Sequence, residues 1–275
     1  MKKRKRISPV RILFYLILIS YAVITLGPFI WTFITSLKPT SEVNKFSVDF
    51  SKLSFKNYTF ILKNFPFTRW MLNSIIVAGV VTVGNLIFNS MAGYALARIN
   101  FPGRNQLFIA ILGMMMIPGQ VVIVPTYMLL SKFGWMDSYL GLTVPFLTSM
   151  FGIFLMRQFF LGIPKDLEEA AAIDGLGRFG TFFRIILPTA TTALTTQFIL
   201  MFTGNWNSFL WPSLIAQSEE MYTLPVGLNS FIGQYISYYD QILAGVMLLS
   251  IPMILVFLIF QKNFIKGIAS TGGKE

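Results

Sequence analysis

The stretch from residue 164 to residue 188 reads PKDLEEAAAIDGLGRFGTFFRIILP, and it is a polar segment between two long uncharged runs. Pro164 suits the first turn of a helix, the acidic residues after it complement the positive end of the helix dipole, and three consecutive alanines extend a helix well. We expect Gly175 to end this helix in a left-handed C-cap conformation. The helix should have about two turns. One of its faces carries residues at i, i+3, i+4 and i+7, which are Leu167, Ala170, Ala171 and Asp174. Because most of these side chains are small, this face is suited to docking against a partner.

The composition places the chain among integral membrane proteins. Of its 275 residues, 55% are hydrophobic and 12% are charged, and the mean hydropathy is +0.67. The absence of Cys and His excludes disulfides, thiolate chemistry and His-based metal or acid–base sites. The net charge of +11 does not indicate nucleic-acid binding, because the basic residues flank apolar runs rather than forming one patch.

Uncharged runs predict an all-α integral membrane protein with six transmembrane helices in one domain, residues 1–275. Each run can hold the roughly 20 residues that cross about 30 Å of hydrocarbon. The first run is too long for a signal peptide and lacks a small-residue cleavage site, so we expect it to be retained. Pro118 should kink the third. The expected spans are 12–37, 71–97, 105–131, 138–156, 187–211 and 241–261, with a cytoplasmic coupling loop at 157–186.

The basic residues predict the orientation of the chain. Most of the 22 Lys and Arg residues lie in the N-terminal segment, the second and fourth connections and the C-terminal tail. Because cytoplasmic loops carry an excess of Lys and Arg, both termini are expected in the cytoplasm.

Three elements of the quoted stretch resemble the EAA signature of permease subunits in binding-protein-dependent ABC importers. They are Glu169-Ala170-Ala171, Asp174-Gly175 and Ile185-x-Leu187-Pro188. The resemblance implies the type I importer permease fold, in which this cytoplasmic helix is the coupling helix that docks on a separate ATPase subunit. The competing interpretation is a solvated loop helix. The resemblance implies five ATPase-coupling residues: Glu169, Ala170, Ala171, Asp174 and Gly175.

Two further segments resemble the carbohydrate-importing branch of this family, nearest to the smaller permease of maltose-type importers. They are FTGNWNSFLWP at 202–212 and TLPVG at 223–227. The resemblance implies import of a sugar or oligosaccharide across the bacterial inner membrane. It also implies a heterodimer with a second homologous permease, two ATPase subunits that bind ATP and Mg, and an extracytoplasmic solute-binding protein. No cofactor is expected on this chain.

Two glycine-rich motifs could have indicated nucleotide binding. Gly175-x-Gly177-x-x-Gly180 matches the dinucleotide fingerprint, but it follows a short helix between two spans and not a strand. The segment 267–274 approaches a phosphate-binding loop but lacks the strand and helix around it. We therefore expect a transport subunit that is not an enzyme, with ATP hydrolysed by another chain.

Two alternative functions stay open at this point. All 11 acidic and all 22 basic residues lie outside the expected spans, which disfavours an ion-coupled secondary carrier because such carriers place a titratable group at mid-membrane. The second alternative is an ABC permease for peptides or amino acids that uses the same EAA helix.

Amide and aromatic side chains within the spans are candidates for the substrate path. A sugar offers hydroxyls to amides and a C–H face to an aromatic ring, whereas the competing interpretation is that the amides join packed helices. The path candidates are Asn205, Trp206, Asn207, Gln197, Asn85, Asn89 and Gln120. One outer loop consists of Ser218, Glu219, Glu220 and Met221. By position it resembles the segment that contacts the binding protein in maltose-type importers. The competing interpretation is an ordinary solvated loop.

Overall fold

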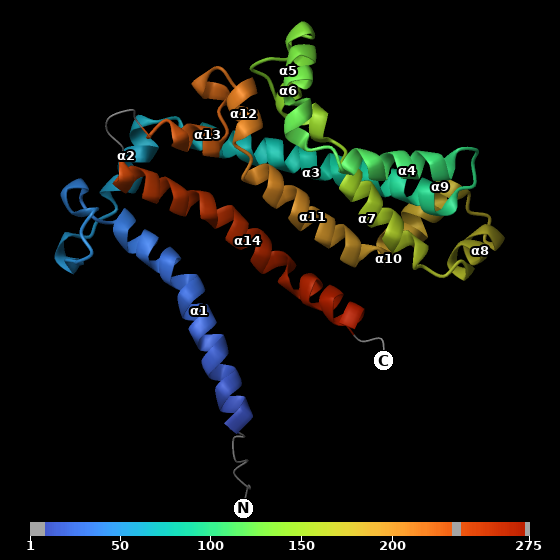
Figure 1. The fold of residues 1–275 in the computed structure, drawn as a ribbon, viewed down its shortest axis with the longest axis horizontal. Helices are drawn as coiled ribbons and strands as arrows, with labels where there is room; N and C mark the ends of the chain where they lie inside the picture. The colour runs from blue at the N-terminus through green and yellow to red at the C-terminus, as the bar shows by residue number, and fades with distance from the viewer. Residues whose placement is uncertain (1–8, 233–237, 273–275) are drawn as a thin grey trace, which may run out of the picture. The chain divides into compact units, whose positions relative to one another are not determined.

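The computed structural model describes residues 9–232 and 238–272, with side chains to residue 261, and its regular elements are helices (Figure 1). The chain divides into two compact units, which are described separately. Unit 1 comprises the residues up to 65 together with 228–250, and unit 2 comprises residues 66–227 together with those from 251 onward. The single domain expected from the sequence stays a prediction.

Unit 1 contains two long apolar helices and a folded connection. Helix α1 (Pro9–Ser36) has a mean hydropathy of 2.1 in its most apolar window, and none of that window is buried. Helix α14 (Tyr239–Gly272) begins in this unit, and its segment 239–261 reaches a mean hydropathy of 2.8. The connection contains the short turns Thr40–Glu42 and Phe50–Lys52 and helix α2 (Lys56–Asn64).

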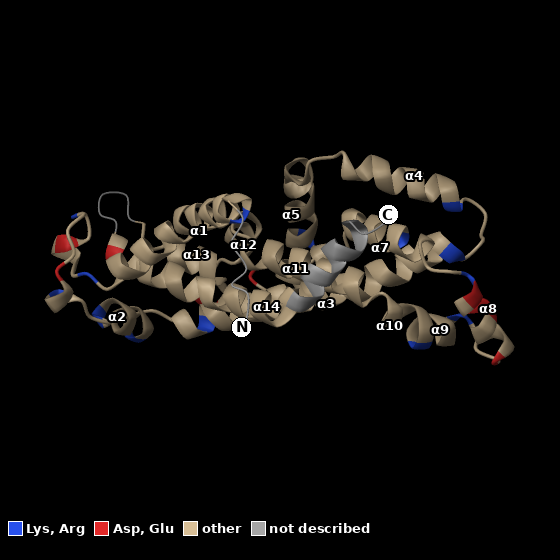
Figure 2. Ribbon diagram, turned by 90° about the horizontal axis from the view of Figure 1, so that it is seen from below, with Lys and Arg blue, Asp and Glu red and all other residues tan. Residues whose placement is uncertain are grey.

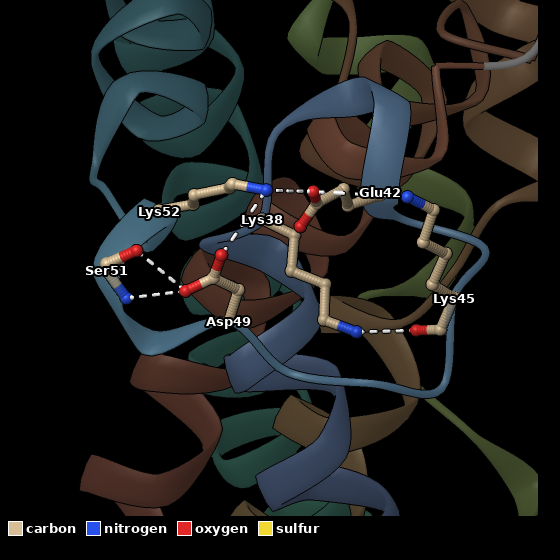
Figure 3. A network of polar contacts seen from close by, with 6 residues as sticks. All are labelled: Lys38, Glu42, Lys45, Asp49, Ser51 and Lys52. Atoms are coloured by element: carbon tan, nitrogen blue, oxygen red, sulfur yellow. Dashed lines mark hydrogen bonds and ion pairs between the residues drawn. The ribbon is translucent and has the colours of Figure 1, made fainter.

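The connection between α1 and α2 is fixed by a buried lysine. Lys38 is 2% exposed, and its Nζ donates to the carbonyl oxygen of Lys45 at 2.7 Å (Figure 3). The same Nζ lies 4.5 Å from the centre of the Trp31 ring. Thr40 donates to the Asp240 carboxylate at 2.6 Å. These contacts hold the loop to both long helices of unit 1.

An exposed charge network lies beside this lysine (Figure 3). Lys52 Nζ lies 2.6 Å from Glu42 and 3.3 Å from Asp49. The hydrogen bond to Glu42 raises the pKa of Lys52, and hydrogen bonds from Ser51 lower the pKa of Asp49. The Glu42 side chain is 14% exposed, whereas Lys52 and Asp49 reach into solvent. Because ion pairs with solvent-exposed partners contribute little, the network orders the loop rather than adding much stability.

Unit 2 is built around helix α3 (Phe67–Arg98), against which α7 (Met150–Leu161) and α11 (Thr191–Trp206) pack (Figure 1). The remaining long elements are bent pairs. Helix α4 (Arg104–Met115) meets the segment Gly119–Lys132, which includes α5 (Ile123–Lys132), at 93°. The segment Tyr139–Phe146, which begins with α6 (Tyr139–Thr143), meets α7 at 41°. The segment Arg178–Thr189 meets α11 at 78°. It consists of α9 (Arg178–Thr181), a π-helical segment (Phe182–Ile186) and α10 (Leu187–Thr189).

These elements give about six membrane spans within the described residues, as the sequence predicted. Three helices are long and apolar enough alone, and there are six spans if each bent pair counts as one. The predicted kink of the third span is confirmed, because Pro118 lies in the break between α4 and the next segment. Proline lacks the backbone N–H that a continuous helix requires.

The helix bounds differ from the expected spans, most clearly in the fourth and fifth. The fourth span was expected to end at residue 156, but α7 continues to Leu161. The Arg157 guanidinium, just past the expected end, lies over the Phe108 ring, 3.7 Å from its centre. The fifth was expected to reach residue 211, but α11 ends at Trp206, and a separate helix α12 (Leu210–Ile215) follows. Pro212 fits the first turn of a new helix but not the interior of a longer one.

Glycines allow α3 and α7 to approach closely. A Cβ added at Gly93 would lie 2.7 Å from Met156 Cβ, and one at Gly152 would lie 2.0 Å from Asn89 Nδ2. Small residues at such contacts are typical of membrane helices, where packing rather than hydrophobicity drives association. Met156 is fully buried, so this contact is part of the core of unit 2.

Candidate coupling and transport sites

The polar stretch forms the predicted short helix. Helix α8 (Asp166–Ile173) has eight residues with three acidic side chains in its first turn, and Figure 2 shows these acidic residues together on α8. Gly175 has a φ of 79°, as predicted. The amide of Leu176 donates to Ala171 O at 2.9 Å, and that of Gly175 to Ala172 O at 3.1 Å. These two bonds make a Schellman C-cap, which satisfies carbonyls that the helix end leaves free.

The outward face of α8 differs from the predicted docking face, most clearly at Ala171. Ala171 is 2% exposed and points inward, whereas Glu169, Ala170 and Asp174 are exposed and Ile173 is 87% exposed. The helix lies against the π-helical segment 182–186, and the small side chain of Ala171 permits this approach. The face that is free for a partner therefore includes Ile173 and excludes Ala171.

An ion pair ties the inward side of α8 to α3. Arg98 Nε, in the last turn of α3, lies 3.5 Å from Glu168 Oε1, with the Arg98 side chain 6% and the Glu168 side chain 22% exposed. The Arg98 guanidinium also donates to the carbonyl oxygen of Ile163, which precedes α8.

Three of the path candidates form a buried network. Asn85 is 1% exposed, and Asn89 and Gln197 are fully buried. Asn89 Nδ2 donates to Asn85 Oδ1 at 2.9 Å, Asn85 Nδ2 donates to Phe146 O at 2.6 Å, and Gln197 Nε2 donates to Asn85 O at 2.9 Å. In this structure these amides join α3, α11 and the segment before α7. They therefore contribute to helix packing, which was the competing interpretation of the amides within the spans.

The other path candidates lie at or beyond the end of α11, apart from Gln120, which is exposed after α4. Trp206 is fully buried and stacks on Phe202, with ring centres 5.7 Å apart. Asn205 is half-buried and donates to Met201 O at 2.7 Å, and Asn207 is exposed. Asn205 and Asn207 can therefore present amides to a solute, and their role in the path stays a prediction.

The outer loop is held by the first turns of α3. Its short turn Glu219–Met221 exposes both glutamate side chains, while the backbone is bound. Trp70 Nε1 donates to Glu219 O at 2.9 Å, and Asn73 Nδ2 donates to Glu220 O at 2.7 Å and to Tyr222 O at 2.8 Å. The loop is thus preformed, with its charges facing outward.

Asp137 holds the other end of this loop, a role that the sequence analysis did not identify. Its Oδ1 accepts from the amides of Gln217 at 2.8 Å and Ser218 at 3.0 Å, and its φ is 51°. Burial alone would raise the pKa of Asp137, but the hydrogen bonds from Ser218 and Gln217 outweigh it, so the pKa lies below its ordinary value of 3.8. Asp tolerates the left-handed conformation better than most residues, which was the available sequence signal.

Helix α3 contacts the outer loop at its first turns and α8 at its last turn. Trp70 and Asn73 bind the outer loop, and Arg98 binds α8. The 28 helical steps from Trp70 to Arg98 span roughly 42 Å at the α-helical rise of 1.5 Å per residue. The two candidate contact sites of unit 2 are therefore separated by more than the thickness of a bilayer's hydrocarbon core.

Known proteins resemble the chain over nearly its whole length. The permease protein AraQ of the arabinooligosaccharides transport system of Bacillus subtilis (strain 168) is 38% identical over 272 residues, which cover 97% of each chain. Its counterpart in Halalkalibacterium halodurans is 34% identical over 279 residues, 98% of this chain and 99% of the relative. The permease protein UgpE of the sn-glycerol-3-phosphate transport system of Pectobacterium atrosepticum is 36% identical over 208 residues, 75% of this chain and 74% of the relative.

A solved structure has the same fold. A chain in the crystal structure of a bacterial ABC transporter involved in the import of the acidic polysaccharide alginate superposes with a TM-score of 0.82. The match covers 95% of this chain and 100% of that chain at 24% sequence identity. This likeness supports the type I importer permease fold predicted from the EAA signature.

Residues 7–270 match the family described as "Binding-protein-dependent transport system inner membrane component". Members of this family are the multi-pass permeases of ABC importers, which depend on a partner permease, ATPases and a binding protein. The match confirms the function predicted from Glu169-Ala170-Ala171 and the residues after it, a transport component and not an enzyme. The chain therefore belongs to the family of binding-protein-dependent transport system inner membrane components and is a permease subunit of an ABC importer.

Proposed function

We propose that this permease imports a neutral oligosaccharide, with a second homologous permease forming the other half of the path. The observation that carries the proposal is the absence of charge in α11: its residues 191–206 include hydroxyl and amide side chains but no Lys, Arg, Asp or Glu. Hydroxyls and amides suit sugar hydroxyls, whereas a phosphate ester favours Arg or Lys. Two relatives from arabinooligosaccharide systems, which align over almost the entire chain, support the same class.

The coupling role belongs to the outward face of α8. Glu169, Ala170, Ile173 and Asp174 are exposed and offer a partner one apolar contact between two carboxylates. Two ATPase subunits that bind ATP and Mg supply the energy, and one of them docks on this face. Gly175 ends the helix in the left-handed conformation, with a φ of 79°. Ala171 does not face the partner. Its small, buried side chain allows α8 to lie close to the bundle, which positions the docking face.

The two contact sites lie on opposite sides of the membrane. The termini and α8 face the cytoplasm, in agreement with the distribution of basic residues, and the loop Ser218–Met221 faces outward. Its exposed Glu219 and Glu220 side chains, on a backbone held by Trp70 and Asn73, form the contact surface for the solute-binding protein. A preformed loop loses little conformational entropy on binding.

Transport by the reconstituted complex tests the substrate class and the energy source together. Proteoliposomes that contain both permeases and the ATPases, supplied with the binding protein, should import arabinotriose only when ATP is present on the ATPase side. Glycerol-3-phosphate serves as the matched anionic solute and should not be imported. Uptake driven by a proton or sodium gradient without ATP would contradict the ATP-driven mechanism. Preferential uptake of glycerol-3-phosphate would overturn the proposed substrate class.

A further inference from the structure

We infer that Arg98 and Glu168 are positioning residues that transmit the movement of α8 to the membrane-spanning helix α3. The inference rests on the proposed function of α8 as the ATPase-docking helix, and it adds the connection between that helix and the bundle. Docking explains how the ATPase reaches this chain. It does not explain how a short surface helix moves a 32-residue helix.

The geometry of the pair suits a connection that resists separation. The Arg98 side chain is 6% exposed and the Glu168 side chain 22%, with Arg98 Nε and Glu168 Oε1 3.5 Å apart. Charges with so little water around them are costly to leave unpaired, so the two side chains should stay together when α8 is displaced. In an exposed ion pair, by contrast, each charged group could separate from the other and be solvated by water at little cost in free energy.

Arg98 holds two points of the coupling segment and not one. Besides Glu168 it binds the carbonyl oxygen of Ile163, five residues earlier in the chain. Both the approach to α8 and its first turn are therefore attached to the last turn of α3. A force on α8 has a direct route to α3 through the ion pair with Glu168 and the hydrogen bond to Ile163 O.

The neighbouring glutamates have opposite orientations and so different roles. Glu168 points toward Arg98 and is half-buried, whereas Glu169 is exposed on the face that is free for a partner. We assign the connection to α3 to Glu168 and the contact with the ATPase to Glu169. Because the two residues are identical and adjacent on one helix, each is a matched control for the other.

The test uses the complete complex of both permeases, the ATPases and the binding protein in proteoliposomes. Glu168→Gln should assemble, yet its stimulation of ATP hydrolysis by arabinotriose-loaded binding protein should fall at least about fivefold, the lower end of coupling between sites. Hydrolysis without binding protein should persist. Glu169→Gln should instead weaken ATPase association, and stimulation should recover at saturating ATPase.

The charge-swapped double variant Arg98→Glu, Glu168→Arg keeps the test decisive if Glu168→Gln assembles poorly. It should recover a large part of the stimulation that either single swap loses, which a purely local packing role would not produce. Wild-type stimulation in Glu168→Gln, or no recovery in the double variant, would overturn the inference. Unchanged ATPase affinity in Glu169→Gln and Glu169→Lys would instead argue against the proposed docking role, so the two failures are distinguishable.

Discussion

Replacing Gly175 isolates the contribution of backbone conformation to coupling. Its φ is 79°, and a Cβ added there would meet nothing within 4 Å. A substitution therefore costs no steric overlap with the rest of the protein. The only penalty is the left-handed conformation, about 1–2 kcal/mol for a residue with a Cβ and more when the side chain is β-branched.

This penalty is small for the fold but large for the end of α8. One to two kcal/mol changes a local equilibrium by a factor of about 5–30. The Schellman bonds from Gly175 to Ala172 and from Leu176 to Ala171 would open in that proportion. The bundle of unit 2 should persist, since the change lies outside its buried core. We expect coupling to decrease in the order Gly, Asn, Ala, Val at position 175, because Asn tolerates the left-handed region.

The assay is ATPase association together with hydrolysis stimulated by the loaded binding protein, for Gly175→Asn, Gly175→Ala and Gly175→Val. Expression and membrane insertion serve as the control and should match the wild-type protein in all three. Equal stimulation in the Asn and Val variants would refute the reasoning, since Asn tolerates the left-handed conformation and β-branched Val does not.

Three further outcomes are expected. Gly93→Ala should destabilise the detergent-solubilised protein by about 1–3 kcal/mol, because the new Cβ would lie 2.7 Å from Met156 Cβ. Gly79→Ala on the same helix, where a Cβ meets nothing within 4 Å, should leave Tm unchanged; equal Tm losses would contradict the packing. The lowered pKa of Asp137 means that its contribution is present above pH 3.8 and is lost as the pH falls through its folded value. Hydrogen exchange at the Ser218 amide should therefore accelerate only in acid, after correction for the intrinsic pH dependence, and Asp137→Asn should abolish this change; a transition near neutral pH would contradict it. Deletion of Ser218–Met221 should slow uptake without affecting assembly, and unchanged uptake would count against the loop's role.

Features that depend on local chemistry could be predicted from the sequence. The first turn and the cap of α8 depend on its acidic residues and Gly175, all within one short segment, whereas Pro164 lies two residues before the helix. The kink at Pro118 likewise follows from one residue. The EAA elements then identified the family without any knowledge of the tertiary structure.

Features that depend on distant neighbours could not be predicted. Ala171 and Ile173 both fit a docking helix, and only the position of α8 against residues 182–186 shows which one faces outward. Similarly, Asn85 and Gln197 could line a path or join helices, because an amide within a span has the same sequence signature in both cases. In this structure they are buried and bonded to each other, which fits packing, and their part in a path stays a prediction.

The most direct test of the central claim is the reactivity of a single cysteine at position 173. The chain has no native Cys, so Ile173→Cys, on a side chain 87% exposed, can be labelled specifically, and Phe46→Cys, at 89% exposure on the connection of unit 1, is the matched control. We expect assembly with the ATPase to protect the cysteine at 173 from maleimide and to permit its cross-linking to the ATPase, while the control stays reactive. Equal labelling at 173 with and without the assembled ATPase would contradict the claim that α8 is the surface on which the ATPase acts.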